Sequence, residues 1–287
     1  TINMKKAILS IDVEDWYHLD YFNREECDTS YSMLDGLDVY IDILESMSVT
    51  SSFFVLGEIA DNRVNYFKDL VSQGYDIGSH GWDHQRPLTM SLSDFQLDLN
   101  KCFNTMKDIN GAKGFGYRAP CFSLDDKRLE IVKNTGFDYD SSRIEFGNHS
   151  LYGSIDMSEY FQYSNSIYHK DNFSEFEVST SKILGKNIPI SGGGYLRIFP
   201  WVITKNLIKS YLKDEDIYIL YIHPFELSQY KLPNLPSSTS HLTNFRCKYG
   251  RKKVAERIKS LIDLLHSYDY EFTTFSAVHE ELAKVVK

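Results

Sequence analysis

The chain has 287 residues, of which 42% are hydrophobic and 25% are charged, an ordinary mixture for a globular protein. Its formal net charge of −9 argues against nucleic acid or an anionic membrane as a partner. No stretch approaches the length of an apolar transmembrane helix, which excludes an integral membrane segment from the expected architecture.

The amino-terminal region and the cysteines bear on the cellular compartment. Met4-Lys5-Lys6 runs directly into a five-residue apolar strand, which is too short for the core of a signal peptide. The four cysteines, at positions 27, 102, 121 and 247, are scattered and form no Cys-x-x-Cys pair. We therefore expect a cytoplasmic protein in a reducing compartment, and we interpret residues 1–3, ahead of Met4, as an artificial extension.

Strand and helix patterns alternate along the first half of the chain. Apolar runs predict strands at 7–11, 52–56, 75–77, 115–117 and 137–140. Helical spacing of apolar residues predicts helices at 34–44, 64–71, 92–106 and 125–135. Ser93 followed by Gln96 forms a capping-box pattern at the start of the third of these helices.

The alternation lapses and then returns in the second half. Residues 142–174 are polar, aromatic and rich in Gly, Ser and Asn, which predicts a long excursion over one face. Strands are expected at 176–178, 187–190, 217–222 and 271–275, and helices at 201–212, 254–265 and from 276. Because no repeat or interdomain linker is evident, we expect one domain over 1–287 with a parallel, barrel-like α/β fold.

Two histidines follow one of the predicted strands. His80 and His84 stand in a glycine-flanked segment where Gly81 disfavours a helix, and the acidic run 12–15 closes the first strand. Since the carboxyl ends of parallel strands share one rim, these groups are expected to lie close together. Two imidazoles with one carboxylate and an open position match a hydrolytic Zn²⁺ site, although Co²⁺, Ni²⁺ and Fe²⁺ accept the same ligands. An isolated His-x-x-x-His is usually not a metal site, so the prediction depends on this context.

Four short motifs together carry a family resemblance. They are Asp12-Val13-Glu14-Asp15, Ser79-His80 with His84, Arg118-Ala119-Pro120 and Tyr221-Ile222-His223. Their order and spacing resemble the polysaccharide deacetylase family (carbohydrate esterase family 4, NodB-like), over residues 6 to about 280. The stretches 192–200, 223–226 and 244–246 resemble the bacterial branch linked to exopolysaccharide and surface-glycan synthesis. The resemblance implies a distorted (β/α)7 barrel and a metal-dependent N-deacetylase acting on an N-acetylated sugar or glycan.

The resemblance also implies a role for each matching residue. Asp12 would be the general base, held in orientation by Arg118, and His223 would protonate the departing amine. His80 and His84 would bind the metal. Five residues are expected to contact the substrate, namely Pro120, Phe122, Arg197, Trp201 and Tyr221.

The chain departs from the family pattern at the metal carboxylate. The usual motif has two adjacent aspartates followed by Gly, whereas this chain has Asp-Val-Glu-Asp. Strand alternation places Asp12 and Glu14 on the same face, which favours Glu14 as the ligand. If the chain has already turned there, Asp15 is the ligand instead.

A second departure concerns the partner of His223. The stretch 192–201 contains no acid, so Asp140 and Glu226 are left as candidates to tune this histidine. We expect Glu226 to bond a neighbouring loop instead, and Asp140 to cap a turn. Arg197 is expected either to bind an anionic group of the substrate or to pair with a structural acid. Pro224 is expected to prevent a helix directly after His223.

Three functions of different kinds fit these observations. The first is the N-deacetylase, the second an amidohydrolase of the same fold acting on a small amide or cyclic ureide, and the third a glycan-binding pseudoenzyme. The complete set of Asp12, His80, His84, Arg118 and His223 argues against the third. The aromatic segment 142–174 favours a sugar over a small ureide.

Overall fold

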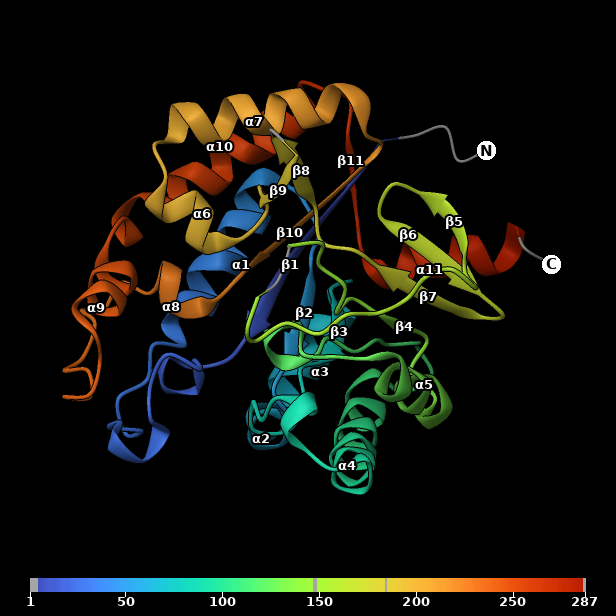
Figure 1. Ribbon diagram of the computed structural model, residues 1–287, viewed down its shortest axis with the longest axis horizontal. Coiled ribbons are helices and arrows are strands. Elements are labelled where there is room, and N and C mark those ends of the chain that lie inside the picture. The colour runs from blue at the N-terminus through green and yellow to red at the C-terminus, as the bar shows by residue number, and fades with distance from the viewer. Residues whose placement is uncertain (1–4, 147–148, 184, 286–287) are drawn as a thin grey trace.

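The computed structural model describes residues 5–146, 149–183 and 185–285 (Figure 1). The expected artificial extension, residues 1–3, lies outside the described residues. None of the helices in the described part of the chain is long and apolar enough to cross a membrane.

A parallel sheet forms the centre of the molecule. Its strands run in the order β10 (Ile217–Ile222), β1 (Lys6–Val13), β2 (Ser52–Val55) and β3 (Asp76–Ser79), and β11 (Glu271–Thr273) pairs in parallel with the first residues of β1. Strands β10, β1, β2 and β3 are buried along their whole length because helices cover one face and the interior side chains fill the other, whereas β11 at the edge is partly exposed.

The sheet continues through single bridges and curves round. Tyr117 bridges Ser79 and Asp140, which joins β3 to β4 (Tyr139–Asp140), and β4 pairs in parallel with β7 (Phe173–Phe176). The chain after β7 then returns to β10, where Ser179 Oγ accepts a hydrogen bond from the Ile219 amide at 2.9 Å. This incompletely closed arrangement is the distorted (β/α)7 barrel expected from the sequence.

Helices surround the curved sheet (Figure 1). In chain order they are α1 (Asp35–Met47), α2 (Gly57–Asn62), α3 (Val64–Ser72), α4 (Leu92–Asn110), α5 (Asp126–Thr135), α6 (Gly193–Ile198), α7 (Trp201–Asp214), α8 (Pro224–Leu227), α9 (His241–Lys248), α10 (Val254–His266) and α11 (Phe275–Val285). Short 3₁₀ turns lie at Trp16–His18, Arg24–Glu26, Pro87–Thr89, Pro120–Phe122 and Arg251–Lys253. The remaining strands are β5 (Phe161–Ser164), β6 (Ile167–Lys170), β8 (Thr180–Ile183) and β9 (Lys186–Pro189).

The two sides of β1 face different cores. Ala7, Leu9, Ile11 and Val13 belong to the larger core beneath the helices, whereas Ile8 belongs to a smaller core inside the barrel. Because side chains alternate along a strand, Asp12 lies on the same side as Ile8, toward the barrel interior. The first strand therefore brings a carboxylate to the interior at its carboxyl end.

Three expectations about local structure are wrong. Helix α4 begins at Leu92 as predicted, but its N-cap is Ser91, which accepts from the Asp94 amide at 3.1 Å, and the predicted capping box of Ser93 and Gln96 lies within the helix. The excursion 142–174 contains β5, β6 and the start of β7, whose pairing is non-local and leaves little periodic signal. Helix α8 starts at Pro224, since proline at the first helical position needs no amide hydrogen.

Candidate active site

Asp12 and Arg118 form a buried ion pair inside the barrel. Arg118 Nη1 lies 2.8 Å from Asp12 Oδ1, and the exposed fractions of the two side chains are 0% and 4%. The remaining donors of the guanidinium are also used, because Nε donates to Ser141 O and Nη2 to Ser141 Oγ, both at 2.9 Å. The face of the Phe54 ring lies 4.2 Å from the guanidinium carbon. Arg118 therefore holds Asp12 in one orientation.

His80 presents a free nitrogen at the end of β3. Its Nδ1 lies 2.8 Å from the carbonyl oxygen of Arg118, so Nδ1 carries the proton and donates it. The lone pair of Nε2 is then free for a ligand. Burial lowers the pKa of His80 to about 4, which keeps the ring neutral at physiological pH. This is the state in which histidine binds a metal.

The backbone after β3 turns back so that His84 faces His80. Gly81 and His84 both have left-handed backbone torsions, with φ of 79° and 69°. The amides of Gly57 and Glu58 at the start of α2 hold this turn by donating to the carbonyls of Gly81 and Trp82, at 2.8 and 3.0 Å. The two imidazole rings are consequently 5.3 Å apart.

Glu14 completes a group of converging ligands. The Oε2 atom of Glu14 is 2.7 Å from Nε2 of His84, yet this buried oxygen is in no hydrogen bond. One ligand atom from each of Glu14, His80 and His84 lies within 4.8 Å of the others. A buried carboxylate oxygen that closely approaches imidazole nitrogens without a hydrogen bond fits a bound divalent cation. The residues present thus fit the group that the sequence implies.

The charge states of this group are compatible with a cation. Burial raises the pKa of Glu14, but the charge of the neighbouring His84 outweighs burial and brings it to about 2. Burial lowers the pKa of His84, and the neighbouring Glu14 carboxylate reverses that effect and raises it. Glu14 is therefore ionised, and the cavity favours a positive charge next to it.

The structure distinguishes Glu14 from Asp15. Asp15 Oδ1 accepts hydrogen bonds from the amides of Trp16 and Met33, both at 2.8 Å, and caps the short helix that follows β1. Within the described residues, two groups are able to hold a metal: one consists of Glu14, His80 and His84, the other of Asp20, His84 and Cys121, and neither contains Asp15. The geometry thus favours Glu14 as the metal ligand, as strand alternation predicts, and Asp15 has a structural role.

His223 lies at the end of β10 on the other side of Glu14. Its Nε2 is 3.6 Å from Glu14 Oε1, and its Nδ1 is 3.2 Å from Glu226 Oε2. Burial lowers the pKa of His223, whereas the hydrogen bond to Glu226 and the charge of that carboxylate outweigh burial and raise it to about 9. His223 is therefore protonated at neutral pH in this arrangement.

Glu226 is the acid that pairs with His223, contrary to the expectation that it bonds a neighbouring loop. The short helix α8 places it three residues after the histidine, where its carboxylate also accepts from the His223 amide at 3.1 Å. Asp140 instead accepts from the Ser142 amide at 2.8 Å, which confirms the predicted turn cap.

The prediction that Arg197 binds the substrate is wrong, because Arg197 pairs with an acid of the protein itself. Its Nε donates to Glu226 Oε1 at 3.0 Å, and its Nη1 donates to the carbonyl oxygens of Arg246 and Tyr249. The residue is only 5% exposed, so its guanidinium is hydrogen-bonded to protein groups and has little access to a ligand. Arg197 therefore fixes Glu226, which in turn fixes His223.

The other expected substrate contacts divide into two sets. Phe122 and Tyr221 lie against each other, with ring centroids 4.9 Å apart, and Pro120 begins the short helix that carries Phe122. Trp201 instead begins α7 and packs against the larger core, so the structure does not group it with the histidines. Trp16 is fully buried in a separate apolar cluster, which identifies it as a packing residue.

Two residues that lie beside the candidate site were not predicted from the sequence. Tyr152 contacts Phe122 at a centroid distance of 5.6 Å, and Asp20 Oδ2 lies 3.4 Å from Nδ1 of His84. The only sequence signal for Tyr152 is the aromatic richness of 142–174. For Asp20 there was none, because it stands in an irregular loop after the first strand.

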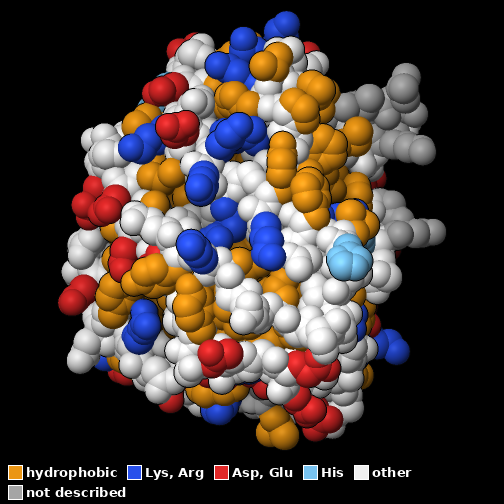
Figure 2. Space-filling model, turned by 90° about the vertical axis from the view of Figure 1, so that its left-hand side faces the viewer, with side chains coloured by type: hydrophobic (Ala, Val, Ile, Leu, Met, Phe, Trp, Pro, Cys, Tyr) orange, Lys and Arg blue, Asp and Glu red, His pale blue; other side chains and the backbone are white. Residues whose placement is uncertain are grey.

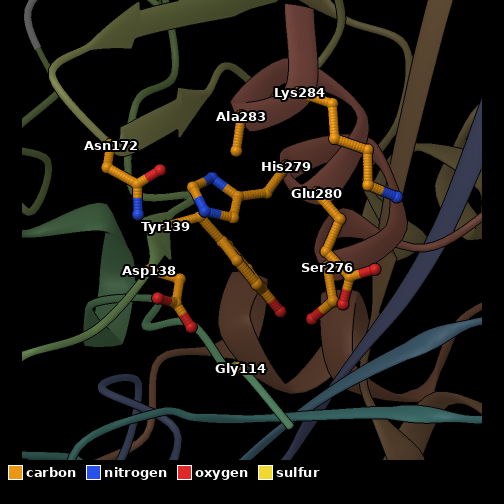
Figure 3. A pocket seen from close by; sticks show the side chains of 9 residues that line it. All are labelled: Gly114, Asp138, Tyr139, Asn172, Ser276, His279, Glu280, Ala283 and Lys284. Carbon is orange, nitrogen blue, oxygen red and sulfur yellow. The ribbon is translucent and has the colours of Figure 1, made fainter. Parts of the chain in front are cut away.

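A separate pocket of about 370 Å³ lies at the opposite rim (Figure 3). Its lining includes Asp138, directly before β4, and Ser276 in the first turn of α11, together with Gly114 and with His279 on α11. The Nδ1 atom of His279 forms a hydrogen bond with Ser174 Oγ at 2.9 Å. Among the described residues, neither group able to hold a metal includes any residue of this pocket. The chemistry is thus concentrated at the carboxyl ends of the strands.

Comparisons with known proteins agree with this geometry. Residues 31–139 match the profile of the polysaccharide deacetylase family, and residues 141–280 match a domain of unknown function, DUF3473. A peptidoglycan deacetylase of Helicobacter pylori is 25% identical over 107 residues, which are 37% of this chain and 36% of that protein. Chitin deacetylase 1 of Cryptococcus neoformans is 25% identical over 96 residues, 33% of this chain and 20% of that protein. The matches thus span well under half of these relatives' lengths.

Solved structures agree on the fold. A protein described as a candidate polysaccharide deacetylase from Mycobacterium smegmatis has a TM-score of 0.62 at 15% identity, covering 99% of this chain and 92% of that one. A carbohydrate esterase family 4 pseudoenzyme from Bacillus anthracis has a TM-score of 0.55 at 14% identity, covering 97% of this chain and 66% of that one. Residues 31–139 are thus similar to polysaccharide deacetylases, and the solved structures show that nearly the whole chain shares the fold of proteins described as polysaccharide deacetylase or carbohydrate esterase family 4 proteins.

Proposed function

We propose that this protein is a metal-dependent N-deacetylase that removes the acetyl group from an N-acetylated sugar of a bacterial surface glycan or of its precursor. The observation that carries the proposal is the convergence of Glu14, His80 and His84 within 4.8 Å, next to a buried base and a protonated histidine. The curated relatives named peptidoglycan deacetylase and chitin deacetylase support the substrate class.

Glu14, His80 and His84 would hold the cation, most fittingly Zn²⁺, with Co²⁺, Ni²⁺ or Fe²⁺ as alternatives for the same ligands. When bound, a divalent cation polarises the amide carbonyl and lowers the pKa of water. The ligand arrangement supports a single ion, because Asp12 is already paired with Arg118.

The protein's own groups account for the proton transfers. Asp12 accepts the proton of the attacking water, and its fixed pairing with Arg118 keeps the accepting oxygen in place. His223 is protonated and donates to the nitrogen as the carbon–nitrogen bond breaks, so that acetate and a free amine leave. An amine is a poor leaving group, and this explains the need for a histidine with a raised pKa.

The aromatic wall supports a sugar substrate. Phe122 contacts both Tyr152 and Tyr221 at the carboxyl side of the barrel, and Tyr21, 58% exposed, comes from the loop after β1. Aromatic rings offer apolar faces to sugar rings and hydroxyl groups to their polar edges. A small ureide would not need a wall built from this many rings.

Acetate release tests the proposal. The purified, metal-loaded protein is incubated with N-acetylglucosamine oligomers and with nucleotide- and lipid-linked N-acetyl sugars, and acetate is measured. We expect release from at least one substrate, abolished in the His80→Ala, His84→Ala double variant. A wild-type protein that holds metal and binds glycan yet releases no acetate from any of them would identify a pseudoenzyme instead.

A further inference from the structure

One face of the molecule exposes many large apolar side chains. Six side chains on α6, α7 and α9 and at their ends are between 45% and 71% exposed, namely Phe199, Val202, Ile203, Leu242, Phe245 and Tyr249. They are half of the large hydrophobic side chains that are exposed among the described residues. Large apolar side chains that are exposed in such number on one face are typical of an interaction surface. We call the surface formed by residues 193–213 and 241–257 the basic-apolar face.

The same face carries a positive charge that the chain as a whole does not. Residues 193–213 and 241–257 contain ten Lys and Arg residues and a single acid, Glu256, in a chain of net charge −9. Arg246, Lys248, Lys252 and Lys253 are exposed. Figure 2, which faces the side of α6, α8 and α9, shows Lys and Arg side chains gathered at the middle with apolar side chains on either side.

The two segments are held together as one surface. Arg197 Nη1 donates to Tyr249 O at 2.9 Å, and Arg257 Nη1 donates to Phe199 O at 3.1 Å. Gly250, with φ of 79°, lets the chain after α9 approach Arg197 so closely that a side chain there would meet its carbonyl oxygen. The apolar residues of α6–α7 and of α9 therefore belong to the same surface.

The composition distinguishes the class of partner. Lysine is depleted from protein–protein interfaces, yet Lys248, Lys252 and Lys253 account for most of the exposed charge here. Nucleic-acid interfaces are more polar than a surface with six exposed apolar side chains. Lys and Arg beside exposed Phe, Leu and Ile are typical of surfaces that lie on anionic lipid, with apolar groups entering the headgroup boundary.

We propose that the basic-apolar face docks the protein on an anionic lipid surface. The proposal departs from the expectation drawn from net charge, because a lipid surface acts on the local charge within about 8 Å at physiological salt. It goes beyond the deacetylase function and does not rest on it, since docking is measured without turnover. Arg197 bridges α9 to Glu226, so the His223 side of the site would lie next to the docked surface.

Vesicle co-sedimentation of the full chain tests the proposal. We expect binding to vesicles of phosphatidylcholine mixed with phosphatidylglycerol, little binding to phosphatidylcholine alone, and weakening as salt rises. Each Lys or Arg near such a surface contributes roughly fivefold in affinity, so Lys248→Glu, Lys252→Glu, Lys253→Glu together should weaken binding at least about tenfold. Val202→Ser with Phe245→Ser should weaken it at low and high salt alike.

Matched control variants lie elsewhere on the surface. Lys107→Glu, Lys127→Glu, Lys182→Glu changes the net charge by the same amount, and Leu97→Ser removes a side chain that is 67% exposed on α4. These variants should bind vesicles like the wild type, and all variants should keep the wild-type melting temperature. Equal weakening by both charge variants would overturn the proposal, and so would a wild type that binds neither vesicle. Binding to soluble polyglutamate or DNA but not to vesicles would replace the lipid surface with an acidic macromolecule.

Discussion

Glu226 Oε2 lies 3.2 Å from Nδ1 of His223, so the histidine at the end of β10 has a buried carboxylate as its partner. The same carboxylate receives Nε of Arg197 at 3.0 Å. Arg197 and Glu226 therefore determine both the orientation and the charge state of the proposed general acid.

Replacing Glu226 should shift the pH profile. His223 has a raised pKa because of Glu226, so it stays protonated, and able to donate, up to a higher pH than an ordinary histidine. In Glu226→Gln this pKa falls, and the alkaline limb of kcat/KM should move to lower pH with a loss of roughly tenfold or more above neutrality. The pH dependence of acetate release measures this.

A matched control is Glu177→Gln, which removes a buried carboxylate paired with Arg143 away from the histidines. It should leave the alkaline limb unchanged. If Glu226→Gln lowers activity uniformly across pH, the role of Glu226 is structural only.

Substitutions of the two candidate metal-binding carboxylates, Glu14 and Asp15, should have different effects on metal content. Glu14→Gln should lower metal content, because an amide oxygen is a weaker ligand than the carboxylate that lies 2.7 Å from His84. Asp15→Asn should keep the metal and stay close to the wild type in stability, since Asn caps a helix about as well as the Asp15 that it replaces. Metal analysis and thermal unfolding distinguish these outcomes. Metal loss in Asp15→Asn alone would reverse the assignment.

Asp12→Asn should retain the metal and lose on the order of 10² to 10⁴ in rate, because an amide cannot accept the proton of water. It should also destabilise the fold by a few kcal/mol, since Arg118 would keep a buried charge without its partner. Ser10→Ala removes another contact of Arg118 but leaves both charges, so it should stay close to wild type. A near-normal rate in a folded Asp12→Asn would move the base elsewhere.

Asp20 should act on the metal through His84. Its carboxylate lies 3.4 Å from Nδ1, the nitrogen of His84 that does not face Glu14. Asp20→Asn should therefore weaken metal affinity by roughly 10-fold to 100-fold, measured by competition with a chelator. Cys121→Ser changes another neighbour of Asp20 and should leave the affinity unchanged. Unchanged affinity in Asp20→Asn would show that His84 needs no such support.

His223→Ala should distinguish amide from ester hydrolysis. The variant should bind metal and hydrolyse N-acetyl substrates poorly, whereas O-acetyl substrates should be less affected because an alkoxide needs less help from an acid than an amine does. Rates on matched N-acetyl and O-acetyl sugars measure the difference. Equal losses on both would indicate that His223 stabilises the oxyanion or shapes the pocket.

The sequence alone determined the alternation of strands and helices and the rim at which the functional groups meet. Periodicity is a local property, and Ile217–Ile222 or the stripe of α10 shows it within a few residues. The carboxyl ends of parallel strands share one rim by topology, which brings Asp12, His80 and His223 together whatever the details of packing.

Only the tertiary structure decided which neighbouring acids serve the site. Glu14 and Asp15 differ in role because the chain turns after β1, where Asp15 accepts a hydrogen bond from the amide of Met33, 18 residues away. Arg197 pairs with Glu226 rather than with a ligand because α6 and α8 pack beside each other. The two residues are 29 positions apart in the sequence. Strand-to-strand and loop-to-loop contacts of this range leave no periodic trace in the sequence, so folding alone selects the partner of each charge.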